Sequence, residues 1–177
     1  MDYTDAMIDL ETMGTEPGCA ILQIGCVLFN DEGLGPEFDY GVDLDSCTGA
    51  GLHVSGSTLN WWLRQSDGAR SALVSPERID VLPVVLHYLR DFLLDKGSHG
   101  MKAWGHGSSF DLAILRAASH ACGMQTPWSF VNERDTHTLA DFAPTAERPK
   151  PELAHRAIDD AKAQAQWVIN MRAVLKK

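Results

Sequence analysis

Five residues in three distant parts of the chain carry side chains that suit a site for divalent metal ions. Asp9 and Glu11 close an apolar run, Asp111 follows a glycine-rich stretch, and His155 and Asp160 lie five positions apart near the C-terminal end. Carboxylate oxygens bind hard divalent cations, and a nearby imidazole can accept a proton. Together these residue types and spacings predict two-metal chemistry on a phosphodiester.

Asp9 and Glu11 are two positions apart on an expected strand, so their side chains point to the same face. Carboxylates side by side repel unless a cation or a shared proton lies between them. The alternative is an exposed edge strand with solvated acids. The apolar residues before Asp9 and the position at a strand end count against it, but the pair alone does not decide between the two. Asp111 also has an alternative role, because an acid in the first turn of a helix favours the helix dipole.

His155 and Asp160 cannot share one face of a helix, because five residues at about 100° each place them roughly 140° apart. For both to line one site, His155 must stand in the loop before the helix, with Asp160 in its first turns. The preceding Pro149-Lys150-Pro151 segment permits this arrangement. A loop histidine suits a general base, which must lie near the water that it deprotonates.

The elements that must position these residues can be read from periodicity and from turn residues. The first three strands form an antiparallel meander with a turn at residues 30–33, and the chain then alternates between helices and one more strand. Strands are expected at residues 5–11, 20–29, 37–42 and 101–104. Helices are expected after a cap at Ser57 or Thr58 and at residues 79–94, 109–122 and 156–174. This order predicts an α/β fold with a mixed central sheet flanked by helices.

Length and composition fit one soluble domain over residues 1–177. The chain is 45% hydrophobic and 22% charged, and it has no apolar run long enough to span a membrane, so we expect a cytoplasmic protein without a membrane partner. The net charge of −9 argues against a non-specific nucleic-acid coat protein. It does not exclude a metallonuclease, because two divalent cations would add about four positive charges beside the phosphate. The four cysteines lack the spacing of a zinc site and are expected to be small buried residues.

The order of the motifs carries a family resemblance. Asp9-Leu10-Glu11, then Phe110-Asp111, then His155 and Asp160 resemble the three motifs of the DEDDh branch of the DnaQ-like 3′→5′ exonucleases. The flanks are similar to the small phage and bacterial exonucleases of the exonuclease VIII-like and mycobacterial exoribonuclease-like group. These flanks are residues 9–14, 20–25, 61–66 and 154–164.

The resemblance implies a ribonuclease H-like fold with two magnesium or manganese ions. It implies that Asp9, Glu11, Asp111 and Asp160 hold the metals, that His155 is the general base, and that Glu11 also belongs to the catalytic set. The expected products are nucleoside 5′-monophosphates released from single-stranded 3′ ends. The location would be a bacterial cell or a phage-infected host.

Substrate contacts are expected around these motifs. In relatives the turn at Thr12, Met13 and Gly14 contacts the terminal nucleotide, and the glycine allows close approach of the backbone. Trp62, Ser108 and Phe110 are further candidates. Scattered basic residues mostly lie on the solvated surface, but four of them are plausible phosphate contacts: Arg64, Arg134, Arg148 and Lys150. Of Trp62 and its neighbour Trp61, at most one is expected to face the site and stack on a base. The sequence departs from the family pattern in two places. Many members carry an asparagine shortly before the second-motif acid, where this chain reads His106-Gly107-Ser108-Ser109, and Arg156 follows the histidine.

Three functions stay open at this stage. DNA is slightly favoured as the substrate, and an exoribonuclease or oligoribonuclease is the first alternative, because discrimination depends on a 2′-hydroxyl contact. A non-catalytic nucleic-acid-binding module is the second, although the intact set of acids and histidine argues against it. A homodimer is also considered, with the tryptophan helix at its interface.

Overall fold

The sheet is the frame of the molecule, and the antiparallel meander at its centre agrees with the sequence-based expectation. The computed structural model describes residues 2–107 and 109–176. Six strands lie in the order β4-β3-β2-β1-β5-β6. Their bounds are β1 Tyr3–Thr12, β2 Ile21–Asn30, β3 Gly33–Val42, β4 Ile79–Asp80, β5 Gly97–Gly105 and β6 Glu133–Asp135. Strands β1 to β3 are antiparallel, and β5 runs parallel to β1, so the predicted mixed sheet is confirmed.

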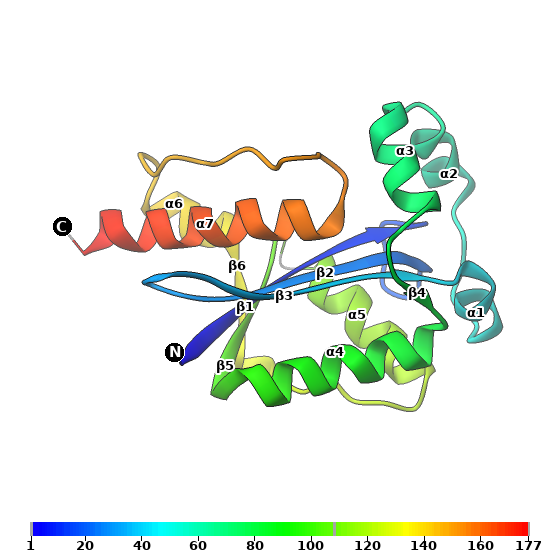
Figure 1. The fold of residues 1–177 in the computed structure, drawn as a ribbon, viewed down its shortest axis with the longest axis horizontal. Helices are drawn as coiled ribbons and strands as arrows, with labels where there is room; N and C mark the ends of the chain where they lie inside the picture. Colours follow the sequence, from blue (N-terminus) through cyan, green and yellow to red (C-terminus); the bar gives the residue numbers. More distant parts are fainter. Residues whose placement is uncertain (1, 108, 177) are drawn as a thin grey trace.

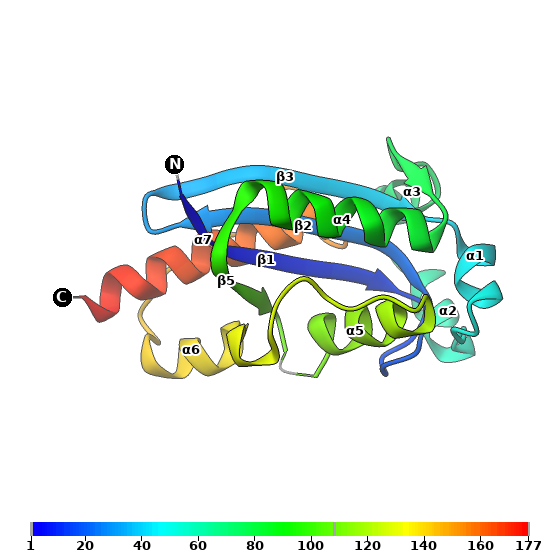
Figure 2. The same ribbon diagram turned by 90° about the horizontal axis from the view of Figure 1, so that it is seen from below.

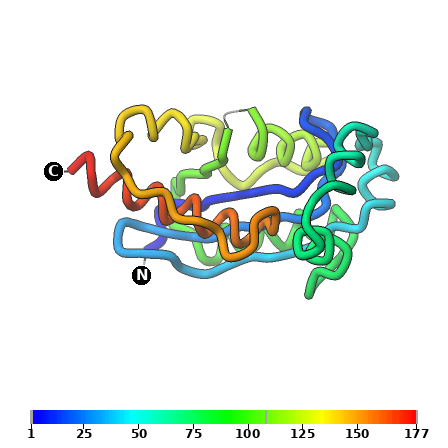
Figure 3. Tube along the Cα trace, turned by 90° about the horizontal axis from the view of Figure 1, so that it is seen from above, coloured from blue at the N-terminus to red at the C-terminus, as the bar shows by residue number. Residues whose placement is uncertain are grey.

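Helices cover both faces of this sheet and one of its ends. The helices are α1 Leu44–Gly49, α2 Gly56–Trp62, α3 Asp67–Val74, α4 Leu82–Lys96, α5 Asp111–Ala121, α6 Thr136–Phe142 and α7 Ala157–Leu175, with a 3-10 turn at Phe130–Asn132. Helix α7 packs across β1, β2 and β3 with α6 beside it, and α4 and α5 cover the opposite face (Figures 1 and 2). Helices α1 to α3 lie at one end of the sheet, and both termini lie toward the other end (Figures 1 and 3).

Two apolar layers explain why the sheet is covered on both faces. Ala6, Ile8 and Leu10 belong to the core on the α4 and α5 side, whereas Met7 belongs to the core under α7. Because side chains alternate along a strand, Asp5, Asp9 and Glu11 face α7 as Met7 does. The acids of β1 therefore lie between the sheet and the last helix.

Several predicted boundaries were wrong, each for a local reason. The helix expected from residue 79 begins at Leu82, because Ile79 and Asp80 pair with β3 as a short parallel strand. The helix with the tryptophans is preceded by Ser55, not capped by Ser57 or Thr58. The strand expected at 101–104 extends from Gly97 to Gly105. The short elements α1, α3, β6 and α6 were not predicted, since stretches of three to eight residues carry little periodicity.

Two further expectations can be compared with the structure. All four cysteines are free thiols, and Cys19, Cys26 and Cys47 are buried, in agreement with their expected role. Within the described residues, the helices are too short or too polar to cross a bilayer.

Candidate active site

A cleft of about 520 Å³ opens where β1 ends and where α5 and α7 begin. The five residues singled out from the sequence all line it. They share it with residues from the turn after β1, from α2 and from the segments before α5 and α7. The cleft is lined by Asp9, Leu10, Glu11, Thr12, Gly14, Thr15, Ser57, Thr58, Trp61, Trp62, His106, Phe110, Asp111, Arg148, His155, Asp160 and Gln164.

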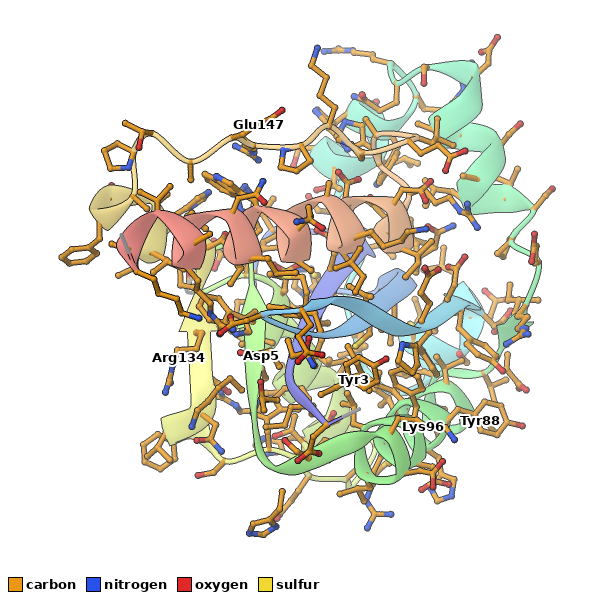
Figure 4. All side chains as sticks on the ribbon, turned by 60° about the vertical axis from the view of Figure 1, so that its left-hand side comes forward. Tyr3, Asp5, Tyr88, Lys96, Arg134 and Glu147 are labelled. Atoms are coloured by element: carbon orange, nitrogen blue, oxygen red, sulfur yellow. The ribbon has the colours of Figure 1, made fainter. Side chains whose placement is uncertain are left out.

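The acids of β1 face α7, and their spacing along the strand matches the spacing of their partners along the helix. Asp5 accepts a hydrogen bond at 2.6 Å from Arg172, and Asp9 accepts one at 2.7 Å from the Gln164 side-chain amide. The four-residue step on the strand spans about 13 Å, and the eight-residue step on the helix spans about 12 Å, so the two elements stay in register while running in opposite directions. Figure 4 marks Asp5 on β1. Two further strand residues and one more helical turn bring Glu11 to Asp160.

Asp111 reaches the same cleft from the first turn of α5. One of its oxygens accepts from the Leu10 backbone N–H at 3.1 Å, and the other accepts from the His106 backbone N–H at 2.8 Å. These bonds fix the carboxylate against both β1 and the end of β5. A favourable position for the helix dipole therefore does not fully explain Asp111, because its side chain is buried and lines the cleft.

His155 lies in the loop before α7, as the angular argument required. Its backbone is left-handed, with φ +63°, and its N–H donates to an Asp160 carboxylate oxygen at 2.8 Å. Ligand atoms of Glu11, His155 and Asp160 all lie within 4.8 Å of one another. The imidazole meets the ring of Trp61 edge-on at 5.1 Å and that of Trp62 at 6.0 Å between centroids.

Close contact between β2 and the start of α7 sets the position of His155 and Asp160. A Cβ on Gly25 would lie 2.2 Å from the backbone carbon of Ala157, so only glycine permits this approach. The buried Gln23 side chain accepts from the Ala157 N–H at 3.4 Å. Arg156, the departure from the family pattern, pairs with Asp39 of β3 at 2.8 Å. Arg156 therefore holds the helix start against the sheet.

The four acids share a strongly unfavourable electrostatic environment for ionised carboxylates. Burial, followed by repulsion from Asp160 and Asp111, raises the pKa of Glu11 to about 8. Burial and the neighbouring acids raise the pKa of Asp9 well above its usual range, although the Gln164 hydrogen bond opposes this. Burial raises the pKa of Asp111 to about 6 and also raises that of Asp160.

Basic side chains of the described residues do little to offset this repulsion. Within the described residues, none of the four carboxylates forms a salt bridge with a lysine or an arginine. Oxygen-rich clusters of this kind fit hard divalent cations. A bound cation would lower the pKa of each acid, and the donor set therefore fits magnesium or manganese.

The predicted substrate contacts fall into three groups. Thr12, Gly14, Trp62 and Phe110 line the cleft, whereas the Met13 side chain is buried in the core and does not line it. The prediction for Ser108 lies outside the described residues.

The two tryptophans differ from what the sequence suggested. Both line the cleft, but Trp62 is buried, and its indole N–H donates to the Thr12 carbonyl at 2.9 Å. Trp61 has the exposed ring, at 43% of its accessible surface. A base-stacking role therefore fits Trp61 better than Trp62.

Gln164 and His106 line the cleft but were not expected to be site residues. Gln164 lies four positions after Asp160, on the same face of α7, and this spacing was the available signal. Of the four basic residues considered as phosphate contacts from the sequence, Arg148 lines the cleft. Burial, with His137 and Arg148 nearby, lowers the pKa of His106 to about 4. Sequence alone gave no signal for His106 and Arg148 as a pair, because 42 residues separate them.

Comparisons with known proteins agree with this geometry. A family model described as the 3′-5′ exoribonuclease Rv2179c-like domain matches residues 4–171. An exodeoxyribonuclease of Enterobacteria phage T4 is 26% identical to the chain and aligns with 97% of it and 89% of the relative.

Solved structures show the same fold at low sequence identity. The nuclease domain of 3′hExo, a DEDDh family member bound to rAMP, has a TM-score of 0.65 and 15% identity, covering 98% of this chain and 94% of that one. Exonuclease X in complex with 5′ overhanging duplex DNA has a TM-score of 0.58 and 17% identity, covering 97% and 93%. The predicted ribonuclease H-like architecture and the resemblance to DEDDh exonucleases are confirmed.

Proposed function

The chain belongs to the Rv2179c-like 3′-5′ exoribonuclease domain family and is a DEDDh 3′→5′ exonuclease, and we propose that it removes nucleoside 5′-monophosphates from single-stranded 3′ ends. One observation carries the proposal. Asp9, Glu11, Asp111, Asp160 and His155 come from three distant parts of the chain and converge in one cleft.

We propose that the four carboxylates hold two magnesium or manganese ions. Such ions, when bound, activate water and stabilise negative charge on the phosphate and on the leaving oxygen. The buried acids support this role, because their raised pKa values show that the folded chain tolerates their charges poorly without cations. Gln164 and the backbone amides of Leu10 and His106 orient the carboxylates.

His155 is proposed as the general base. An unprotonated ring nitrogen accepts the proton of the attacking water, and the water oxygen bonds to the phosphorus. The bond between phosphorus and the 3′ oxygen of the preceding nucleotide breaks, and that oxygen takes up a proton. Contact with Trp61 and Trp62 restricts the imidazole to the cleft wall, near the Glu11 and Asp160 carboxylates.

The substrate preference has one supporting comparison on each side. DNA is proposed as the favoured substrate, because the phage relative that aligns with almost the whole chain is named an exodeoxyribonuclease. RNA is the second candidate, because the family model is described as an exoribonuclease.

The test uses 5′-labelled DNA and RNA oligonucleotides of one sequence with magnesium or manganese. We expect a ladder that shortens from the 3′ end, with DNA shortened faster, and we expect EDTA or D9N to abolish it. D95N is the matched control, because Asp95 is exposed at the end of α4 and lines no part of the cleft. If neither strand is shortened, the proposed activity is wrong, and faster shortening of RNA would reverse the preference.

A further inference from the structure

An arginine shares the cleft with the four acids. Arg148 comes from the connection between α6 and α7, is exposed, and lines the cleft. It forms no salt bridge with a carboxylate in the part of the chain that the structure describes. In a chain with a net charge of −9, a guanidinium that lines a cleft and has no acid partner is available for an anion.

The position of this guanidinium is fixed by its surroundings. Its central carbon lies 4.6 Å from the centroid of the Trp167 ring. The residue before it, Glu147, lies on the connection that passes over α7 (Figure 4), and its carbonyl accepts a hydrogen bond at 2.9 Å from the Asn170 side chain. Less side-chain entropy is therefore lost when Arg148 binds a ligand.

The arginine is also linked to the acid cluster. Arg148 donates to Nε2 of His106 at 3.0 Å, so neutral His106 carries its proton on Nδ1, which lies 2.6 Å from the Thr136 hydroxyl. The backbone N–H of His106 donates to Asp111. Nε2 of His137 lies 3.1 Å from Nε2 of His106. His106 therefore connects Asp111 of the acid cluster to the guanidinium that would bind an anion.

Given the exonuclease function proposed above, on which this inference rests, we propose that Arg148 binds the phosphate on the 5′ side of the scissile phosphate. The scissile phosphate belongs beside the acids, where cations balance its charge. The next phosphate along the strand carries a negative charge and needs a donor from the protein. A substrate must then have at least two phosphodiesters, and so at least three nucleotides, to use this contact.

The experiment compares a trinucleotide, which has two phosphodiesters, with a dinucleoside monophosphate, which has one and lacks a terminal phosphate. We expect R148A to lower kcat/KM for the trinucleotide about tenfold or more, through KM, and to leave the dinucleotide unchanged. The salt dependence of the trinucleotide reaction should weaken by a slope of about one, and R148K should restore it in part. R90A on α4 is the matched control, because Arg90 is exposed and lies outside the cleft.

Two outcomes with active wild-type enzyme would overturn the inference and leave the exonuclease function intact. An equal loss on both substrates would place Arg148 at the scissile phosphate. No loss on either substrate would show that Arg148 only packs against Trp167. Wild-type enzyme that cleaves neither substrate would instead remove the proposed function, and the inference with it.

Discussion

Replacing Glu11 with glutamine should stabilise the metal-free protein at pH 8. Glu11 is buried beside Asp160 and Asp111, and its pKa of about 8 is far above the value of 4.5 for an unperturbed glutamate. For an acid with a raised pKa, the folded state binds more protons than the unfolded state, so stability falls as pH rises from about 4.5 through 8. E11Q removes the ionisable group, and the variant should therefore not lose this part of its stability as pH rises.

The size of the effect follows from the same pKa difference. At about 1.4 kcal/mol for each pKa unit, the ionisation of Glu11 costs the folded state roughly 4 kcal/mol at pH 8 and less than about 1 kcal/mol at pH 5. These are upper values, because the acids titrate together and share their repulsion. At roughly 2–4 °C per kcal/mol for a chain of this size, the melting temperature of E11Q should exceed that of wild type by up to roughly 8–16 °C at pH 8.

The assay is thermal unfolding followed by circular dichroism in EDTA at pH 5 and at pH 8. E32Q serves as the control, because Glu32 lies exposed in the turn between β2 and β3 and should change neither melting temperature. If the melting temperature of E11Q were equal to or below that of wild type at pH 8, the charge of Glu11 would not destabilise the folded state. The argument that the acids require cations would then lose its main support.

Three further predictions concern the same site. Magnesium should raise the melting temperature of wild type more at pH 8 than at pH 5, because protonated acids bind cations poorly; calorimetry at both pH values measures this, and equal shifts would contradict it. H155N should lower kcat roughly 10²- to 10⁴-fold in a single-turnover assay, and near-normal turnover would exclude His155 as the base. G25A should cost about 1–3 kcal/mol in urea unfolding and reduce activity, because its Cβ would meet the backbone of Ala157, whereas G56A, which meets open space, should do neither.

Much of the site could be predicted because its signals are local. The period of two along β1 placed Asp9 and Glu11 on one face, and the angle between His155 and Asp160 placed the histidine outside the helix. Both conclusions need only the geometry of a single element. The mixed sheet followed in the same way from runs of branched residues and from the turn at residues 30–33.

The remaining features depend on contacts between distant segments. Which tryptophan is exposed depends on the hydrogen bond from Trp62 to Thr12, across 50 residues. The approach of α7 to β2 depends on Gly25, which the sequence placed within an expected strand without indicating its contact with Ala157. The pairing of Arg148 with His106 likewise requires the path of the connection over α7. Contacts of this kind produce no periodic pattern in the sequence around either residue.

The left-handed backbone at His155 decides how the base can be tested. With φ +63°, this position suits glycine, asparagine and, to a lesser extent, histidine, whereas alanine would add strain of about 1 kcal/mol. The hydrogen bond from this residue to Asp160 comes from its backbone, so any substitution except proline can keep it. H155N therefore removes the imidazole while preserving both the turn and the orientation of Asp160. A loss of activity in H155N reports on proton transfer, whereas the same loss in H155A would mix proton transfer with a displaced metal ligand.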